Sequence, residues 1–345
     1  MSTNSSATAF RASFDACKEV TARCPVRATT LGYYPILGLN AFFAAGFGLA
    51  ALVTLFFGIR KRTWGYSLAV AAGCILECAG MTPPFPYPGW DDPTDRNPGY
   101  IGRALLAKNP WNSDAFKLQI TAIVLGPTLV CVGLYLTLKH LTTINPALSR
   151  LAPRWYPLIF VPADVSCLVI QAIGGGMAAA AKRDKPQMAN HGNRMIIAGI
   201  VLQVVVLGAF GSLSSEYLFR VKRWAATVGG DTSRETARGL ALWRDKKFRI
   251  FVWGMSGAYV ALLLRCIYRI AEMAGGWGNH IMQDEVSFIV LESFMVLIAS
   301  VLLAVIAPGV FVPEMWNSGD TKGVAEKGTT DGGSEGTELE KSVRV

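Results

Sequence analysis

Residues 249–278 read RIFVWGMSGAYVALLLRCIYRIAEMAGGWG, and this stretch decides the fold. Most of its residues are apolar, yet Arg265, Arg269 and Glu272 lie in its second half. Their spacing of four and three residues puts the three charges on one face of a helix. A charge in hydrocarbon costs about 2.5–3.5 kcal/mol on insertion scales, so such residues normally face a bundle interior and find partners. The stretch therefore predicts a membrane helix with a polar inner face.

A second apolar run follows at 286–309, VSFIVLESFMVLIASVLLAVIAPG, in which Glu292 is the single charged residue. The whole chain of 345 residues is 52% hydrophobic and 17% charged, whereas a soluble protein is about one quarter charged. The runs lack the alternation of a membrane barrel, so helices are expected to satisfy the backbone. The sequence thus predicts an all-α, polytopic membrane protein.

Seven apolar segments are each long enough to cross about 30 Å of hydrocarbon. The predicted spans are 36–59, 64–81, 116–139, 155–181, 195–219, 248–273 and 286–311. They form a predicted seven-helix membrane domain over 35–313, preceded by a polar segment at 1–34. A proline-rich stretch at 82–98 is either an outer loop that caps the bundle or a tolerated surface insertion. The tail at 314–345 has too little apolar surface to fold, so we expect it to be disordered.

Lysine and arginine set the expected orientation. The first inner loop would hold Arg60-Lys61-Arg62, and the third, at 220–249, holds nine basic residues against three acidic ones. Inner loops carry such an excess, so the sequence predicts an extracellular N-terminus and a cytoplasmic C-terminus. Asn4 of Asn-Ser-Ser is then a glycosylation acceptor outside the cell. Cys17 and Cys24, which lie in the same polar segment, could form a disulfide there.

Composition also argues against several functional classes. The formal net charge of +9 comes largely from loops between apolar runs, which reflects topology and not nucleic-acid binding. The three histidines lie at predicted helix ends or in loops, so no metal site or Ser–His pair is predicted. No Walker-type motif is present, and the seventh span lacks the lysine of a retinal protein. We therefore predict no enzyme, no cofactor and no direct use of ATP.

Polar residues inside the predicted spans are the candidate site. Two interpretations remain open: the acids fasten helices by pairing with Arg265 and Arg269, or they bind a cationic head group or a proton. For Arg269 the expected cross-helix partners are Glu77 and Asp164, and for the two glutamines ordinary interhelical hydrogen bonding is favoured. The candidate residues are Glu77, Asp164, Gln171, Gln203, Arg265, Arg269, Glu272, Glu285 and Glu292.

Asp164 is the strongest candidate for binding a head group. Gln171 lies seven residues further along the same predicted helix, so the two side chains share a face. The glycine triplet at 174–176 follows directly and would allow another helix to approach closely.

Several short motifs follow one another along the chain: Tyr34-Pro35 with Asn40 and Phe47, Glu77-x-x-Gly80, Gly99-Tyr100-x-x-Arg103, Asp164 with Gln171, Gly199-x-x-x-Gln203, Arg265-x-x-Tyr268-Arg269-x-x-Glu272 with Glu285, and Pro308-Gly309. In this order they resemble the fungal lipid-translocating exporter family, which includes sphingoid long-chain-base exporters and aminocholesterol-resistance proteins. The resemblance covers about 33–309 and departs from the family pattern in three places. First, the proline-rich stretch separates Glu77, in the second predicted span, from Gly99-Tyr100-x-x-Arg103. Second, Glu292 stands where Asp is usual, and third, Lys139 or His140 stands where Arg is usual.

This resemblance implies that the chain exports or flips amphipathic lipids at a fungal plasma membrane, or gives resistance to toxic amphiphiles. Its partners would be membrane lipids, including sphingoid long-chain bases. The alternative is a seven-helix receptor or sensor that regulates lipid asymmetry, because the predicted topology and the basic third inner loop suit it equally. The substrate, the coupling ion and the oligomeric state stay open at this point.

Overall fold

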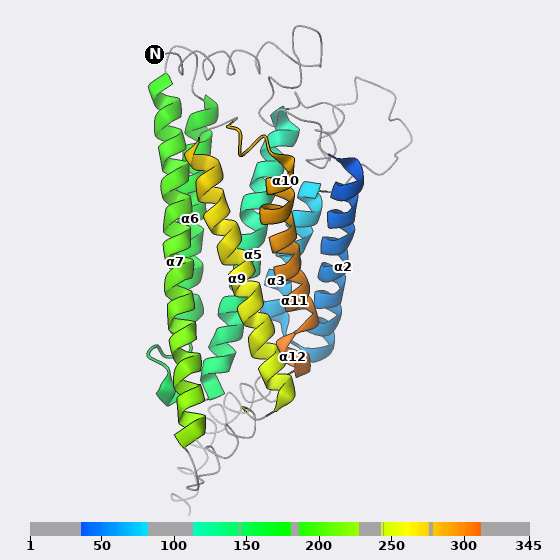
Figure 1. Ribbon diagram of the computed structural model, residues 1–345, viewed down its shortest axis with the longest axis vertical. Helices are drawn as coiled ribbons and strands as arrows, with labels where there is room; N and C mark the ends of the chain where they lie inside the picture. The colour runs from blue at the N-terminus through cyan, green and yellow to red at the C-terminus, as the bar shows by residue number, and fades with distance from the viewer. Residues whose placement is uncertain are drawn as a thin grey trace, which may run out of the picture.

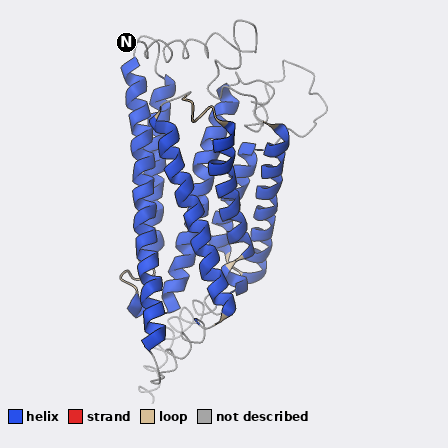
Figure 2. Cartoon of the chain, in the orientation of Figure 1, coloured by secondary structure: helices blue, strands red, loops and turns tan. Residues whose placement is uncertain are grey.

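The computed structural model describes residues 36–81, 113–144, 146–180, 186–227, 243, 245–275 and 279–311. Within these ranges every regular element is a helix, and no strand occurs (Figure 2). The prediction of an all-α protein is confirmed. The predictions for Asn4, Cys17, Cys24, the stretch at 82–98 and the tail at 314–345 lie outside the described residues.

Within the described residues, seven helical spans run along the long axis of the molecule (Figure 1). Each is long and apolar enough to cross a membrane, which confirms the predicted seven-helix, multi-pass membrane protein. Helix α5 lies centrally, because it packs against α3, α6, α9 and α11. The spans are α2 (Leu37–Lys61), α3 (Trp64–Met81), α5 (Ser113–Ile144), α6 (Trp155–Ala180), α7 (Pro186–Thr227), α9 (Lys246–Ala274) and the seventh, which begins with α10 (Glu285–Phe288).

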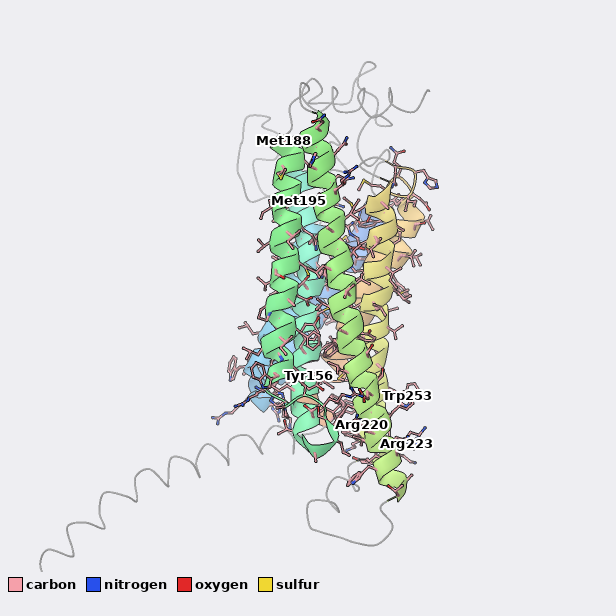
Figure 3. The ribbon with its side chains drawn as sticks, turned by 90° about the vertical axis from the view of Figure 1, so that its left-hand side faces the viewer. Tyr156, Met188, Met195, Arg220, Arg223 and Trp253 are labelled. Carbon is pink, nitrogen blue, oxygen red and sulfur yellow. The ribbon has the colours of Figure 1, made fainter. Side chains whose placement is uncertain are left out.

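The surface of the bundle is apolar where a membrane would contact it. Leu52 of α2 and Leu68 of α3 are both 67% exposed, and Trp253 of α9 is 74% exposed and points away from the bundle (Figure 3). Large exposed apolar surfaces would favour aggregation in water, whereas hydrocarbon accommodates them at no cost. The exposed side chains therefore mark the lipid-facing surface.

Glycines bring two pairs of helices into close contact. Between α3 and α5, a β-carbon at Gly73 would lie 2.7 Å from the carbonyl oxygen of Gly126. Between α6 and α7, a β-carbon at Gly174 would lie 2.7 Å from the carbonyl oxygen of Gly192. Small residues of this kind let membrane helices approach until their backbones touch. Of the triplet at 174–176, Gly174 makes this contact, while a β-carbon at Gly175 or Gly176 would meet nothing within 4 Å.

Helix α7 is much longer than predicted. It covers Pro186–Thr227 instead of 195–219, and its 42 residues extend about 63 Å at about 1.5 Å per residue. Hydropathy marks only the apolar part, whereas helical hydrogen bonding continues through the polar ends. Figure 3 shows Met188 and Met195 towards one end of the helix, with Arg220 and Arg223 towards the other.

The seventh span is not one continuous α-helix, as predicted over 286–311. After α10, residues Ile289–Phe294 form a π-helix, labelled η3, and α11 continues over Met295–Val305. Ile306 then leaves the helical conformation two residues before Pro308, and α12 covers Pro308–Phe311. The π turn carries Glu292, and π-bulges inside helices are frequent at functional sites.

Candidate substrate and charge network

Arg265 of α9 and Glu292 of the π turn form an ion pair in the bundle interior. The Nη2 and Nε atoms of Arg265 donate to Oε1 of Glu292 at 2.7 Å and 3.0 Å. Both residues are almost completely buried, at 3% and 1% exposure. The Nη2 atom also donates to the carbonyl oxygen of Ile123 on α5. Arg265 thus ties α9 to the seventh span and to the central helix.

Arg269 pairs with Glu272 of its own helix, through Nη1 and Oε2. The prediction that Glu77 or Asp164 is its cross-helix partner is wrong, because neither acid lies within 4 Å of it among the ion pairs of the described residues. A spacing of three residues places Glu272 beside Arg269 on the same helix face, so the pair needs no second helix. The predicted common face of Arg265, Arg269 and Glu272 is confirmed, since all three are buried in α9.

Glu77 of α3 lies directly against the backbone of α5. A β-carbon at Gly126 would come within 2.7 Å of the Oε1 atom of Glu77, so a larger residue would clash with the carboxyl group. Glu77 is 2% exposed, and its Oε1 atom has no hydrogen-bond partner among the described residues. It interacts electrostatically with Arg265 and Arg269, without forming an ion pair with either.

Asp164 of α6 lies in a second polar group, formed by α5, α6 and α7. The hydroxyl of Tyr135 on α5 donates a hydrogen bond to Oδ2 of Asp164 at 2.7 Å. Asp164 is 1% exposed, and in the part of the chain that the structure describes its Oδ1 atom has no hydrogen-bond partner.

The two glutamines connect the same three helices. Nε2 of Gln171 on α6 donates to Oε1 of Gln203 on α7, and Nε2 of Gln203 donates to Oγ1 of Thr128 on α5, both at 3.2 Å. The interhelical hydrogen bonding predicted for these glutamines is confirmed. Gly199 makes room for it, because a β-carbon there would lie 2.6 Å from Cγ of Gln171.

Glu285 is a candidate that the structure places apart from the buried groups. It begins α10 at the end of the bundle, where its Oε1 atom accepts a hydrogen bond from the backbone N–H of Ile36 at 3.0 Å. Sequence reasoning missed Gly126, Thr128 and Tyr135, which complete the site on α5. The dipeptide Gly126-Pro127 inside an apolar span was the available signal, since neither residue favours a helix interior.

Neither of the two polar groups is a metal site. In the described part of the chain, no set of three His, Cys, Asp or Glu side chains could hold a metal ion. The site as built offers fixed positive charge at Arg265, and two carboxyl groups, of Glu77 and Asp164, that lack an ion-pair partner among the described residues.

Comparison with known proteins identifies relatives with similar sequences. The chain is 31% identical over 236 residues to the sphingoid long-chain base transporter RSB1 of Saccharomyces cerevisiae, a match that covers 61% of this chain and 60% of the relative. It is 27% identical over 209 residues to protoporphyrin uptake protein 1 of the same species, covering 60% of this chain and 63% of that protein. The chain thus spans about three fifths of the length of these relatives. No solved structure matches the chain.

A family model covers most of the membrane domain. The model described as RTA1 like protein matches residues 97–315, which is more than half of the chain. Protein RTM1 of Saccharomyces cerevisiae is a further relative, at 24% identity over 249 residues, with 71% of this chain and 68% of the relative covered. These matches confirm the resemblance to fungal lipid exporters. The chain belongs to the RTA1-like family of multi-pass membrane proteins.

Proposed function

We propose that this chain moves amphipathic lipids with a cationic head group, of the sphingoid long-chain-base class, across the plasma membrane without direct use of ATP. One observation carries the proposal: the interior holds more acid than base. In the described bundle, Arg265 and Arg269 are each paired with one glutamate, while Glu77 and Asp164 keep carboxyl oxygens without partners. An uncompensated buried charge is expensive, so a polar interior with spare acid suits a cation that comes and goes.

Asp164 is the proposed ligand of the lipid amine. Its Oδ2 atom is held by Tyr135, which fixes the carboxyl group and leaves Oδ1 for the amine. Charge-assisted hydrogen bonds of this kind are about twice as strong as neutral ones. The amides of Gln171, on the same helix as Asp164, and of Gln203, on α7, offer donors and acceptors to the hydroxyl groups of a sphingoid base.

The name of one relative supports the same class of substrate, and that of another supports the movement of amphipathic molecules in general. One is named a sphingoid long-chain base transporter and another a protoporphyrin uptake protein, so both are named for moving an amphipathic molecule. Neither name describes an enzyme, and we propose no chemical step for this chain. A plasma-membrane location follows from the same proposal and is tested by imaging a fluorescent fusion beside a plasma-membrane marker.

The decisive experiment is translocation in liposomes that contain the purified full chain. A fluorescently labelled long-chain base is placed in one leaflet, and its arrival in the other leaflet is followed by chemical quenching. We expect the protein to accelerate movement at least tenfold over protein-free liposomes, and Asp164→Asn to remove most of that gain. The matched control is Glu285→Gln, which changes an acid at the helix end.

The sensor alternative predicts the opposite result. Its support is the basic end of the bundle, where Arg150 and Arg220 both pair with Glu216, at 2.7 Å and 2.6 Å. A sensor would signal through such an end without carrying lipid. If wild-type protein leaves the labelled lipid in its original leaflet, the transport proposal fails and the sensor is favoured.

A further inference from the structure

We infer that Glu77 is a proton-binding site, separate from the lipid site at Asp164, and that it couples lipid movement to a proton gradient. This inference rests on the proposed function and adds the coupling ion to it.

The first argument is the position of the carboxyl group. Glu77 lies against Gly126, where the missing side chain gives its carboxyl group room, and within the described helices its Oε1 atom has no hydrogen-bond partner. Burial of a carboxylate oxygen without a donor is costly, whereas a carboxylic acid in the same place carries no net charge. The site therefore accommodates Glu77 best when it holds a proton.

The second argument is the charge balance around it. Arg265 with Glu292, and Arg269 with Glu272, form two buried pairs that together carry no net charge. Glu77 is the additional acid that faces this group, so its ionisation gives the group one uncompensated negative charge. Binding or release of a single proton at Glu77 thus switches the group between neutral and negative.

The third argument is that an ionised Glu77 would compete with Glu292 for Arg265. Arg265 contacts α5 at the carbonyl oxygen of Ile123, three residues before Gly126, where Glu77 lies. Among the described residues, Glu77 interacts electrostatically with Arg265 and Arg269 of α9 and with Glu292 of the π turn. On its own helix, the titratable neighbours are Cys74 and Cys78. Loss of the proton would draw Arg265 away from Glu292 and so loosen the π turn. This exchange links a proton to the packing of the seventh span.

A proton fits the site better than a metal cation does. Hard cations such as Ca²⁺ require about six to eight oxygen ligands, and Mg²⁺ requires near-octahedral geometry. In the described ranges no group of three His, Cys, Asp or Glu side chains could hold a metal ion. One carboxyl group is sufficient for a proton.

The first test measures the proton itself and does not depend on transport. Infrared difference spectra of the purified, monodisperse full chain are recorded as pH is changed. We expect a protonated-carboxyl band that disappears as pH rises, is missing in Glu77→Gln, and is moved in Glu77→Asp. A band that is unchanged in both variants assigns the proton elsewhere and overturns the inference.

The second test applies a pH gradient to the liposomes of the transport assay. For one-to-one exchange of a proton for a lipid cation, one pH unit drives a tenfold difference in lipid distribution at equilibrium. Wild type and Glu285→Gln should show this response, Glu77→Gln should not, and Glu77→Asp should regain part of it. Protein-free liposomes measure passive redistribution of the amine, which is subtracted.

The outcomes separate the two proposals. Wild-type protein that moves no lipid overturns the proposed function, and the infrared test then still decides whether Glu77 binds a proton. Wild-type protein that moves lipid without responding to the pH gradient keeps the proposed function and overturns the coupling. Glu77→Gln that responds as wild type does also overturns it.

Discussion

Pro127 of α5 and Arg265 of α9 are joined through one carbonyl oxygen. Proline has no backbone N–H, so within a helix the carbonyl four residues earlier loses its donor. For Pro127 that carbonyl belongs to Ile123, and Nη2 of Arg265 donates to it. A carbonyl without a donor is costly in hydrocarbon. The helix defect made by Pro127 is therefore the feature that fixes Arg265 beside Glu292.

Pro127→Ala should separate activity from stability. The alanine N–H would bond to Ile123 and compete with Arg265 for this carbonyl oxygen, which weakens a charged hydrogen bond worth about 1.5–3 kcal/mol. Removal of an interior proline stabilises the helix by about 3 kcal/mol. We expect a similar melting temperature in detergent but a clear loss of resistance to a toxic long-chain base. Pro162→Ala, in the interior of α6, is the matched control and should keep resistance; equal loss in both variants would contradict the role of Pro127.

Arg265→Ala alone should lower the thermal stability more than the double change of Arg265→Ala with Glu292→Gln. The single change leaves Glu292 buried without its cation, and breaking a buried pair costs about 3–5 kcal/mol. The double change removes both charges, so we expect it to recover at least half of the lost thermal stability. Melting temperatures of the purified single and double variants measure this directly. Absence of any recovery would show that the pair contributes through something other than charge compensation.

Gly192→Ala should destabilise the protein, whereas Gly175→Ala should not. A β-carbon at Gly192 would lie 2.6 Å from both the Ala178 nitrogen and the Gly174 oxygen, which are backbone atoms that cannot turn away. Overpacking of this kind costs about 1–3 kcal/mol. A β-carbon at Gly175 meets nothing within 4 Å, so that variant is the control. Comparable melting temperatures of the two variants would argue against close packing of α6 on α7.

Topology gives a further prediction. The excess of basic residues in the predicted inner loops predicts an extracellular N-terminus and a cytoplasmic C-terminus. A glycosylation tag inserted beside Pro86 should be modified, and a tag inserted after Gly323 should remain unmodified. Mobility on gels before and after deglycosylation gives the answer, and the reverse pattern would invert the assignment of every loop.

Hydropathy was sufficient to predict the seven spans, because each apolar run corresponds to one crossing. It did not predict where helices end, as α7 shows, since polar residues at 186–194 and 220–227 continue the same hydrogen-bonded helix. Nor could it predict the π turn around Glu292, because that turn adds a residue without changing the apolar pattern.

Periodicity predicted which charges face inward, but not which atoms pair. Arg265, Arg269 and Glu272 lie on one buried face as expected. The acid that pairs with Arg265 comes from the seventh span, and Arg269 pairs within its own helix. Pairing depends on the rotation and depth of each helix, which a single sequence does not encode in its spacing. The link between Gln171 and Gln203 was predictable because both are polar residues within neighbouring apolar spans.

The glycine contacts also limit where a lipid tail can travel. Where the backbones of α6 and α7 touch at Gly174 and Gly192, and those of α3 and α5 touch at Gly73 and Gly126, no gap as wide as an acyl chain remains. A lipid whose head group reaches Asp164 must therefore trail its tail into the bilayer through another side of the bundle. The tail cannot pass between the helices at the two glycine contacts. We expect it to leave the bundle between helices that contact each other through flexible side chains.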